Sequence, residues 1–262
     1  MVCISMAIRR FQVGSLKVEI HPDSESAGKA AGEAAAECMR QLAARQESIG
    51  VIFATGASQL FMLRALVSIP GLPWDKIVGF HMDEYIGLDE NHRASFRHYL
   101  RNELTSRVHM REFTGVNGNA DPATVCREYA AKLRAANPQL CLLGIGENGH
   151  LAFNEPDQAD FKDPVDAKVV TLDAACRKQQ LAEGWFDSIE EVPSQAISLT
   201  IPTLFRVPKL ILSIPGPRKA LIVKRSLTEP ISTDCPATIL RTHPDVTAYL
   251  DPESGAQLGD FR

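Results

Sequence analysis

Gly144-Ile145-Gly146-Glu147-Asn148-Gly149-His150-Leu151-Ala152-Phe153-Asn154-Glu155-Pro156 is the stretch that decides the fold, and it follows directly on the apolar run Leu140-Cys141-Leu142-Leu143. The apolar run has the length and composition of a short buried strand. The glycines that follow allow the backbone to turn sharply and to approach a ligand closely. Polar side chains then appear in an otherwise apolar setting, namely His150, Asn154 and Glu155. Because open α/β sheets bind ligands at the carboxyl ends of their strands, the stretch predicts a core strand that ends in a binding loop.

Strand-like and helix-like segments alternate on both sides of this stretch. Alternating or continuous apolar runs predict strands, and segments with helical periodicity predict helices. The expected strands are 16–20, 50–54, 76–82, 140–143, 168–172, 196–200, 209–214 and 246–250, and the expected helices are 24–45, 59–69, 94–106, 121–136, 173–182 and 220–227. Residues 201–205 form a short turn or helix, and 154–167 form an irregular flap or lid. This alternation predicts an α/β fold with a mostly parallel sheet and helices on both faces, a Rossmann-like three-layer sandwich in a single domain over 1–262.

Composition narrows the choice of partners and compartment. The 262 residues carry a net charge of −4 with a pI of about 6.0, so neither nucleic acid nor an anionic membrane is an expected partner. No apolar run reaches the ~18 residues of a membrane span, and residues 1–14 lack the apolar core of a signal peptide. The six cysteines are scattered without a C-x-x-C pair, which favours reduced, buried thiols in a cytoplasmic protein. Because the net charge is negative, an anionic ligand would need a local positive charge at its binding site.

Polar or glycine-rich loops end four of the expected strands, at 55–58, 83–85, 144–155 and 215–219. Parallel strands bring their carboxyl ends to one edge of a sheet, so these loops are expected to meet in one crevice. Thr55-Gly56-Ala57-Ser58 lies between a strand and a helix, where backbone N–H groups favour a phosphate. A plain turn with Ser58 as the helix N-cap is equally open at this point. The last loop adds two cations, Arg218 and Lys219.

The same loops contain the parts of an acid–base site. His150 and Glu155 lie close in sequence, and a histidine oriented by a carboxylate is a general acid–base pair that titrates near neutrality. Asp83, the first of two adjacent acids, would serve as a base if burial raised its pKa. Plainer alternatives are a solvated loop for Asp83-Glu84 and a hydrogen-bonded structural role for His150. A zinc set of Asp83, His150 and Glu155 ranks lower because no metal-binding motif accompanies it, so neither a metal nor a cofactor is expected.

Two longer motifs resemble one enzyme family. Met82-Asp83-Glu84-Tyr85-Ile86-Gly87-Leu88 and the stretch 144–156, together with the Thr55-Gly56 turn, are similar to the glucosamine-6-phosphate deaminase family. That family lies within the superfamily of glucosamine/galactosamine-6-phosphate isomerases and 6-phosphogluconolactonases. The resemblance runs from the first expected helix to the last expected strand. The Asp-Glu-Tyr form and the Ala-Phe-Asn-Glu-Pro ending resemble deaminases, whereas lactonases typically have an Asp-Glu-Arg form and a Gly-His-Thr-Ala-Ser ending.

This resemblance implies a reaction in which glucosamine 6-phosphate and water give fructose 6-phosphate and ammonia. It implies that Asp83 moves the proton between C2 and C1 of the open-chain sugar, and that His150 assists ring opening with Glu155 as its carboxylate partner. Asn148 is a fourth catalytic position, which is an acid in some members of the family. Since an asparagine carries no charge, the charge balance of the histidine would rest mainly on Glu155.

For the phosphate of the substrate, the resemblance implies a binding turn with Thr55, Gly56 and Ser58 and a phosphate-binding lysine, Lys219. Members of the family often have a second glycine in this turn. The family also has a phosphate-binding arginine, and the candidate for it here is Arg177, although the segment around that residue does not align cleanly.

Other activities stay open at this point. The expected partner is a small sugar phosphate, and the expected protein is a hydrolase of amino-sugar metabolism and N-acetylglucosamine catabolism, with a homo-oligomer as a candidate assembly. A 6-phosphogluconolactonase, another amino-sugar-phosphate isomerase or a non-catalytic sugar-phosphate sensor are the alternatives, because one fold can carry several functions. A sensor would usually carry a DNA-binding domain, and the segment before the first expected strand is too short for a helix-turn-helix and linker.

Overall fold

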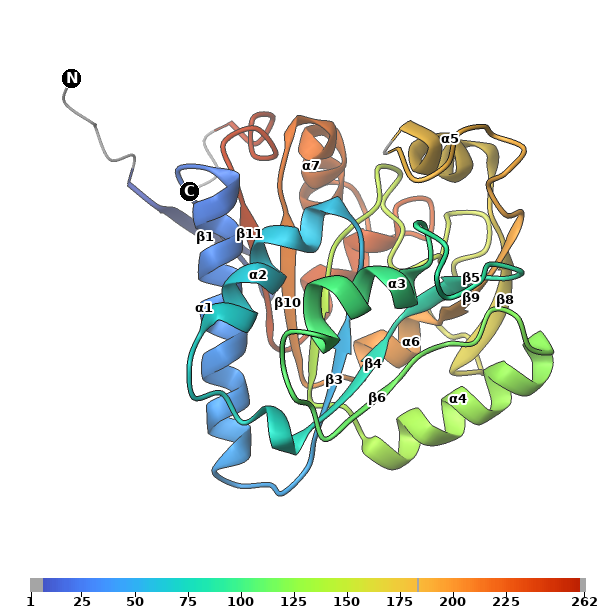
Figure 1. Cartoon of the computed structure of the whole chain (residues 1–262). Helices are drawn as coiled ribbons and strands as arrows, with labels where there is room; N and C mark the ends of the chain where they lie inside the picture. Colours follow the sequence, from blue (N-terminus) through green and yellow to red (C-terminus); the bar gives the residue numbers. More distant parts are fainter. Residues whose placement is uncertain (1–6, 183, 260–262) are drawn as a thin grey trace.

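A twisted eight-stranded sheet forms the centre of the molecule (Figure 1) in the computed structural model, which describes residues 7–182 and 184–259. The strand order is β1-β2-β11-β10-β7-β3-β4-β6, and all neighbours are parallel except β1 and β2. The strands are β1 Arg9–Val13, β2 Leu16–Ile20, β3 Ile49–Phe53, β4 Ile77–His81, β6 Glu112–Thr114, β7 Leu140–Leu143, β10 Lys209–Ile214 and β11 Val246–Leu250. The chain runs outward through β3, β4 and β6 on one side and through β10 and β11 on the other, so β7 lies where the direction of winding reverses. Open α/β sheets bind ligands at such a switch point.

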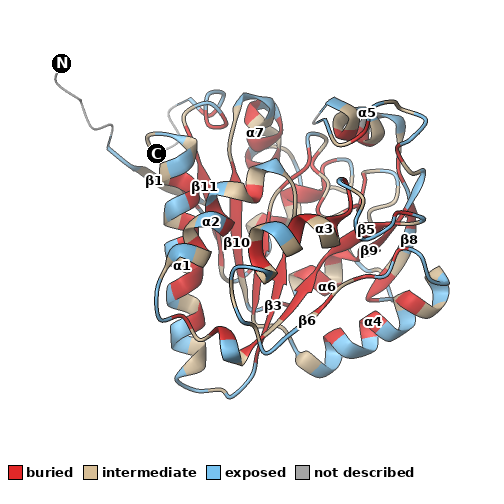
Figure 2. Cartoon of the chain, in the orientation of Figure 1, coloured by how far each residue is buried: buried red, intermediate tan, exposed pale blue. Residues whose placement is uncertain are grey.

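Helices cover both faces of this sheet. The helices on one face are α1 (Ser24–Ala43), α2 (Leu60–Ser68) and α3 (Phe96–Leu100). The last of these continues into π-helical turns at Arg101–Thr105. The helices on the other face are α4 (Pro122–Ala136), α6 (Ile201–Phe205) and α7 (Ala220–Thr228). Alternation along β3 explains the two layers, because Val51 and Phe53 pack under the first set of helices and Ile52 under the second. Figure 2 shows the result: the central strands β3 and β7 are buried throughout, and the long helices bury one side each. The predicted three-layer α/β fold is confirmed.

The close packing of α1 on α2 follows from small residues. Asp23 caps α1 by accepting a hydrogen bond from the Ser26 N–H at 2.7 Å. A β-carbon on Gly28 would lie 2.3 Å from the Phe61 Cβ, so the two helices can approach this closely only because position 28 has no side chain. The helix ends at Ala43, two residues before the predicted end at Arg45.

A second, three-stranded antiparallel sheet corrects one part of the prediction. Its order is β5 (Asp83–Tyr85), β9 (Gln195–Leu199), β8 (Ala167–Thr171), and α5 (Ala174–Ala182) lies beside it. The segments 168–172 and 196–200 are strands as predicted, but they pair with each other and with β5 rather than with the main sheet. Their periodicity identifies strands without naming the partner. The sheet forms its own apolar cluster around Tyr85, Phe96, Phe153 and Phe186.

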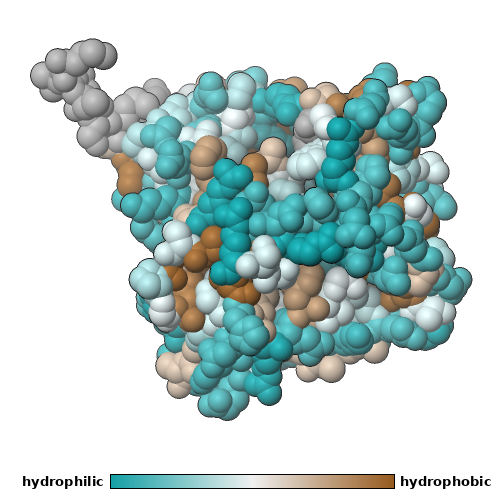
Figure 3. Space-filling model, in the orientation of Figure 1, coloured by the Kyte–Doolittle hydropathy of each residue, from teal (hydrophilic) through white to brown (hydrophobic). Residues whose placement is uncertain are grey.

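No helix among the described residues has the length and apolar character needed to cross a membrane. In the orientation of Figure 3 the surface is mostly hydrophilic, with hydrophobic residues in separate patches. Cys141, Cys176 and Cys235 are buried and unpaired as predicted, but Cys38 and Cys126, also unpaired, are only half-buried, and Cys3 lies outside the described residues, as does part of the segment 1–14. The single domain over 1–262 and the homo-oligomer stay predictions.

Candidate active site

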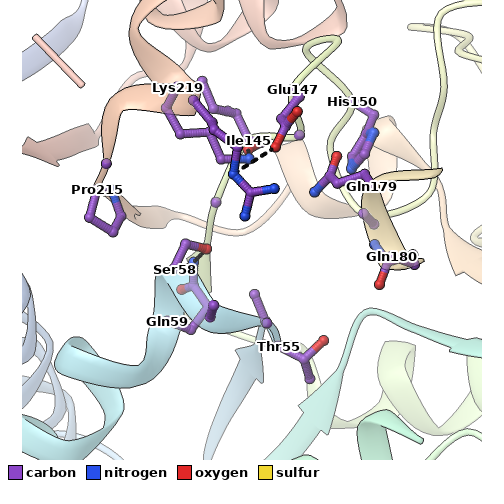
Figure 4. Close-up of a pocket in the computed structure, with 18 of the residues that line it drawn as sticks. Thr55, Ser58, Gln59, Ile145, Glu147, His150, Gln179, Gln180, Pro215 and Lys219 are labelled. Carbon is purple, nitrogen blue, oxygen red and sulfur yellow. Dashed lines mark hydrogen bonds and ion pairs between the residues drawn. The ribbon is translucent and has the colours of Figure 1, made fainter. Parts of the chain in front are cut away.

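The strand-end loops meet around one cavity of about 380 Å³. The turn after β3, the glycine-rich loop after β7 and the turn after β10 line it side by side, as their neighbouring places in the sheet require. The junction of β4 and β5 and one side of α5 complete the wall. Of the predicted site residues, Thr55, Gly56, Ser58, Asp83, His150 and Lys219 line this cavity. Figure 4 shows how they are distributed, with Thr55 and Ser58 on one side, Lys219 opposite and His150 beside Gln179.

Two turns of nearly the same backbone geometry flank the loop after β7. Gly56 has φ 95° and ψ 167°, and Gly216 has φ 92° and ψ 158°, values that favour glycine. Each is followed by a three-residue 3₁₀ turn and then a helix, α2 or α7. The first turn keeps its N–H groups, whereas Pro217 in the second has none. Backbone donors for an anion therefore come mainly from residues 55–58, and the second turn contributes charged side chains instead.

A buried glutamine, Gln59, ties these turns together and was missed in the sequence. Its Nε2 donates to the Ser58 Oγ at 2.9 Å and to the Ser213 carbonyl of β10 at 3.3 Å. A β-carbon on Gly144 would lie 2.8 Å from the same Nε2, so a side chain at position 144 would displace the Gln59 amide. Ser58 accepts from Gln59 and makes no capping hydrogen bond, so the plain N-cap interpretation of this serine is wrong.

The two adjacent acids at the β4–β5 junction have different roles. Glu84 points into the protein, where its carboxylate accepts hydrogen bonds from Ser95 Oγ (2.8 Å), the Phe96 N–H (3.1 Å) and Arg97 Nε (3.2 Å), and so holds the start of α3. Asp83 lines the cavity instead. Burial, followed by the nearby negative charge of Glu84, raises the pKa of Asp83 well above its usual value. A carboxyl group with a raised pKa on a cavity wall is suited to take up and return a proton.

His150 and Glu155 form a buried pair on the glycine-rich loop. The His150 Nδ1 lies 3.0 Å from the Glu155 Oε1, and the glutamate is fully buried. Asn148 connects both residues, since its amide nitrogen donates to the other oxygen of Glu155 and its Oδ1 accepts from the His150 N–H at 3.1 Å. With Nδ1 facing the carboxylate, the other ring nitrogen is the one that can exchange a proton with a ligand. A β-carbon on Gly146 would lie 2.2 Å from the imidazole, so this glycine makes room for the ring.

The carboxylate of Glu155 is kept ionised by its neighbours. Burial alone would raise the pKa of Glu155, but the charge of the neighbouring His150, the hydrogen bond from the Asn148 amide and the nearby Cys176 thiol outweigh it and lower the pKa to about 2. Glu155 therefore carries the negative charge beside His150, as expected from an asparagine, which has no charge, at position 148. Asn148 and Glu155 do not line the cavity themselves and reach it through the imidazole.

Arg177 does not reach the cavity, and this part of the prediction is corrected. Its guanidinium donates to the carbonyls of Ile189 (2.5 Å) and Val192 (3.0 Å) and so holds the loop before β9. The same helix instead brings Gln179 and Gln180 to the wall. Gln180 is fixed there because its Oε1 accepts from the Tyr85 hydroxyl at 2.8 Å. The predicted segment therefore does reach the cavity wall, but through a different side of α5.

Among residues 7–182 and 184–259, no group of three or more His, Cys, Asp or Glu side chains is placed to hold a metal ion. The alternative zinc set of Asp83, His150 and Glu155 is not assembled, because His150 directs its Nδ1 at Glu155 and Glu155 lies behind it.

Fold and cavity together define an α/β protein with acid–base groups at the switch point of a parallel sheet. The family model described as glucosamine-6-phosphate isomerases/6-phosphogluconolactonase matches residues 22–248, and the chain belongs to this family.

Individual relatives agree with this assignment. The chain is 36% identical to the glucosamine-6-phosphate deaminase of Exiguobacterium sibiricum over 181 residues, which is 69% of this chain and 70% of the relative. Its fold is similar to that of a monomeric glucosamine-6-phosphate deaminase, with a TM-score of 0.85 and 29% identity, covering 92% of this chain and 99% of the other. The 6-phosphogluconolactonase of Thermotoga maritima has the same fold, with a TM-score of 0.74 and 18% identity over 89% of this chain and 98% of the other.

Proposed function

We propose that this chain is a glucosamine-6-phosphate deaminase, an enzyme that converts glucosamine 6-phosphate and water into fructose 6-phosphate and ammonia. The named relatives support the substrate, because the two deaminases are 36% and 29% identical to the chain, whereas the lactonase, at 18%, shares little more than the fold. The observation that carries the proposal is the presence, around one cavity, of a buried carboxyl group with a raised pKa, a histidine–glutamate pair and a turn suited to phosphate.

Asp83 is the proposed base of the isomerisation. It removes the C2 proton of the open-chain amino sugar and returns it to C1, so the amino carbon becomes the carbon of a ketone after water replaces ammonia. Burial favours this role, since a base works best when its pKa lies near the working pH. The developing negative charge on the sugar oxygen needs a hydrogen-bond donor nearby, and the loop after β7 lines the same cavity as Asp83.

His150 is the proposed acid–base group of ring opening. Its outward nitrogen moves the proton between the C1 hydroxyl and the ring oxygen, while Glu155 and Asn148 keep the imidazole in one orientation. The phosphate is proposed to bind the turn with Thr55, Gly56 and Ser58, with Lys219 across the cavity. Binding energy from this remote group positions the reacting carbons.

A substrate panel tests the proposal. The purified protein is incubated with glucosamine 6-phosphate, galactosamine 6-phosphate and 6-phosphogluconolactone, and ammonia, ketose phosphate and acid release are measured. We expect ammonia and fructose 6-phosphate from the first substrate, and at least a ~10³-fold loss of kcat for Asp83→Asn with the fold retained. The matched control is Asp121→Asn, the same chemical change at the N-cap of α4, where asparagine also caps well.

Other results would point elsewhere. Lactone hydrolysis without ammonia would make the chain a lactonase, and stabilisation by glucosamine 6-phosphate without turnover would make it a sensor. Either outcome would contradict the proposed activity.

The finer assignments belong to the same proposal. Because the net reaction consumes water at a C–N bond, the enzyme is a hydrolase, and its substrate places it in amino-sugar breakdown such as N-acetylglucosamine catabolism. The unpaired thiols among the described residues support a reducing compartment such as the cytoplasm.

A further inference from the structure

An ion pair lies on the wall of the cavity, and the proposed mechanism does not use it. The Arg218 Nε is 3.4 Å from the Glu147 Oε1, with the arginine on the turn after β10 and the glutamate on the loop after β7. Both residues line the cavity. Their side chains are 54% and 35% exposed, so the pair is only loosely held in its present geometry.

The phosphate of the expected substrate needs more positive charge than one lysine supplies, and Arg218 is placed to provide it. A phosphate monoester carries about −1.5 to −2 charges at neutral pH, more than one cation offsets. Arg177 is directed away, and the lysine and arginine side chains among the described residues that line the cavity are Lys219 and Arg218. Lys219 is oriented by its hydrogen bond to the Ile145 carbonyl at 2.8 Å. The second positive charge at the wall belongs to Arg218.

We propose that Arg218 binds the phosphate of the substrate and that Glu147 competes with the phosphate for its guanidinium. This inference rests on the proposed function, which supplies the phosphorylated substrate. Exchange of partner is favoured because a guanidinium binds phosphate through two parallel hydrogen bonds, whereas an exposed ion pair contributes little. Glu147 thereby weakens phosphate binding, both by holding Arg218 and by repelling the dianion.

Substitutions at the two positions should act in opposite directions. Arg218→Ala should raise KM for glucosamine 6-phosphate and the dissociation constant of inorganic phosphate about tenfold, since one charged hydrogen-bonding partner is lost. Arg218→Lys should recover part of that loss, because it restores the charge without the planar fork. Glu147→Gln should lower both constants about two- to threefold, and added salt should shrink this gain. The change should lie mainly in KM, as expected for uniform binding.

The experiment measures kinetics with glucosamine 6-phosphate and, separately, titration calorimetry with inorganic phosphate. Arg64→Ala is the matched control, since Arg64 is also 54% exposed and paired with a glutamate at 3.1 Å but does not line the cavity. Unchanged constants for Arg218→Ala would overturn the inference, as would weaker binding for Glu147→Gln or a wild-type protein that binds no phosphate. The calorimetric arm needs no turnover, so a protein that binds phosphate through Arg218 without releasing ammonia would refute the proposed function alone.

Discussion

Glu155→Gln removes the charge of a fully buried carboxylate while keeping the size of the side chain. The pKa of Glu155 falls from an ordinary 4.5 to about 2 in the folded protein. At about 1.36 kcal/mol per pKa unit, this corresponds to about 3 kcal/mol of stability. A folded-state pKa below the unfolded value means that the unfolded chain binds the proton more tightly. The contribution is therefore fully present above pH 4.5 and is lost as the pH falls toward 2.

Urea unfolding of the wild type and of Glu155→Gln measures this contribution across pH. We expect the wild type to be more stable at pH 5 by up to about 3 kcal/mol, because the positive charge of His150 is the largest of the contributions that lower the pKa of Glu155. The difference should narrow as the pH falls below 4.5, because glutamine does not titrate. Comparing two proteins that share every other carboxyl group isolates the one at position 155.

A control variant shows how much the loss of a carboxylate costs when the side chain is not fully buried. Glu229→Gln removes a partly exposed partner of Arg225, 2.8 Å away, and should cost less than about 1 kcal/mol at neutral pH. A Glu155→Gln difference that stays constant from neutral to acidic pH would refute the reasoning, since it would mean that Glu155 contributes packing rather than a stabilised charge.

Three further substitutions test other contacts. Gly146→Ala puts a β-carbon 2.2 Å from the His150 ring, so we expect a ~10²-fold loss of kcat with little change in melting temperature, and unchanged kinetics would contradict the proposed role of the ring position. Glu84→Gln weakens the anchor of α3 and leaves Arg97 without its buried counter-charge, which should lower the free energy of unfolding by about 3 kcal/mol in urea. Gln180→Leu removes an amide from the cavity wall and should raise KM about fivefold, whereas an unchanged KM would show that the substrate does not contact this residue.

The strands that the sequence predicted best are short buried runs of apolar residues. The strands Lys209–Ile214 and Val246–Leu250 have the predicted bounds, because each is a buried apolar run between polar turns. The edge strand β1 was missed, since its arginines interrupt the apolar pattern that identifies strands, and an edge strand tolerates such residues. The second sheet was missed because β5 has only three residues and its pairing is decided by tertiary contacts.

The candidate site was predictable where the chemistry and the turn lie together in sequence. His150, Glu155 and Asn148 belong to one loop whose glycines predict a tight turn. Their proximity in the structure therefore followed from their closeness in sequence. The choice between Asp83 and Glu84 depends on which side chain faces the cavity, and that is set by the entry of β5 into the small sheet. Arg177 and Gln180 show the same limit, because the side of α5 that faces the cavity depends on a sheet that was not predicted.

The cavity draws its wall from segments scattered between Ser24 and Lys219, and this has a consequence for the lifetime of the protein. No short piece of the chain can form the binding surface, so a ligand that occupies it binds the native state and not the unfolded chain. Bound ligand then adds to the free energy of unfolding, by about 2.7 kcal/mol at a concentration 100 times the dissociation constant. Since proteases in the cell act on unfolded molecules, bound ligand slows the degradation of this protein. When the ligand is used up, degradation becomes faster.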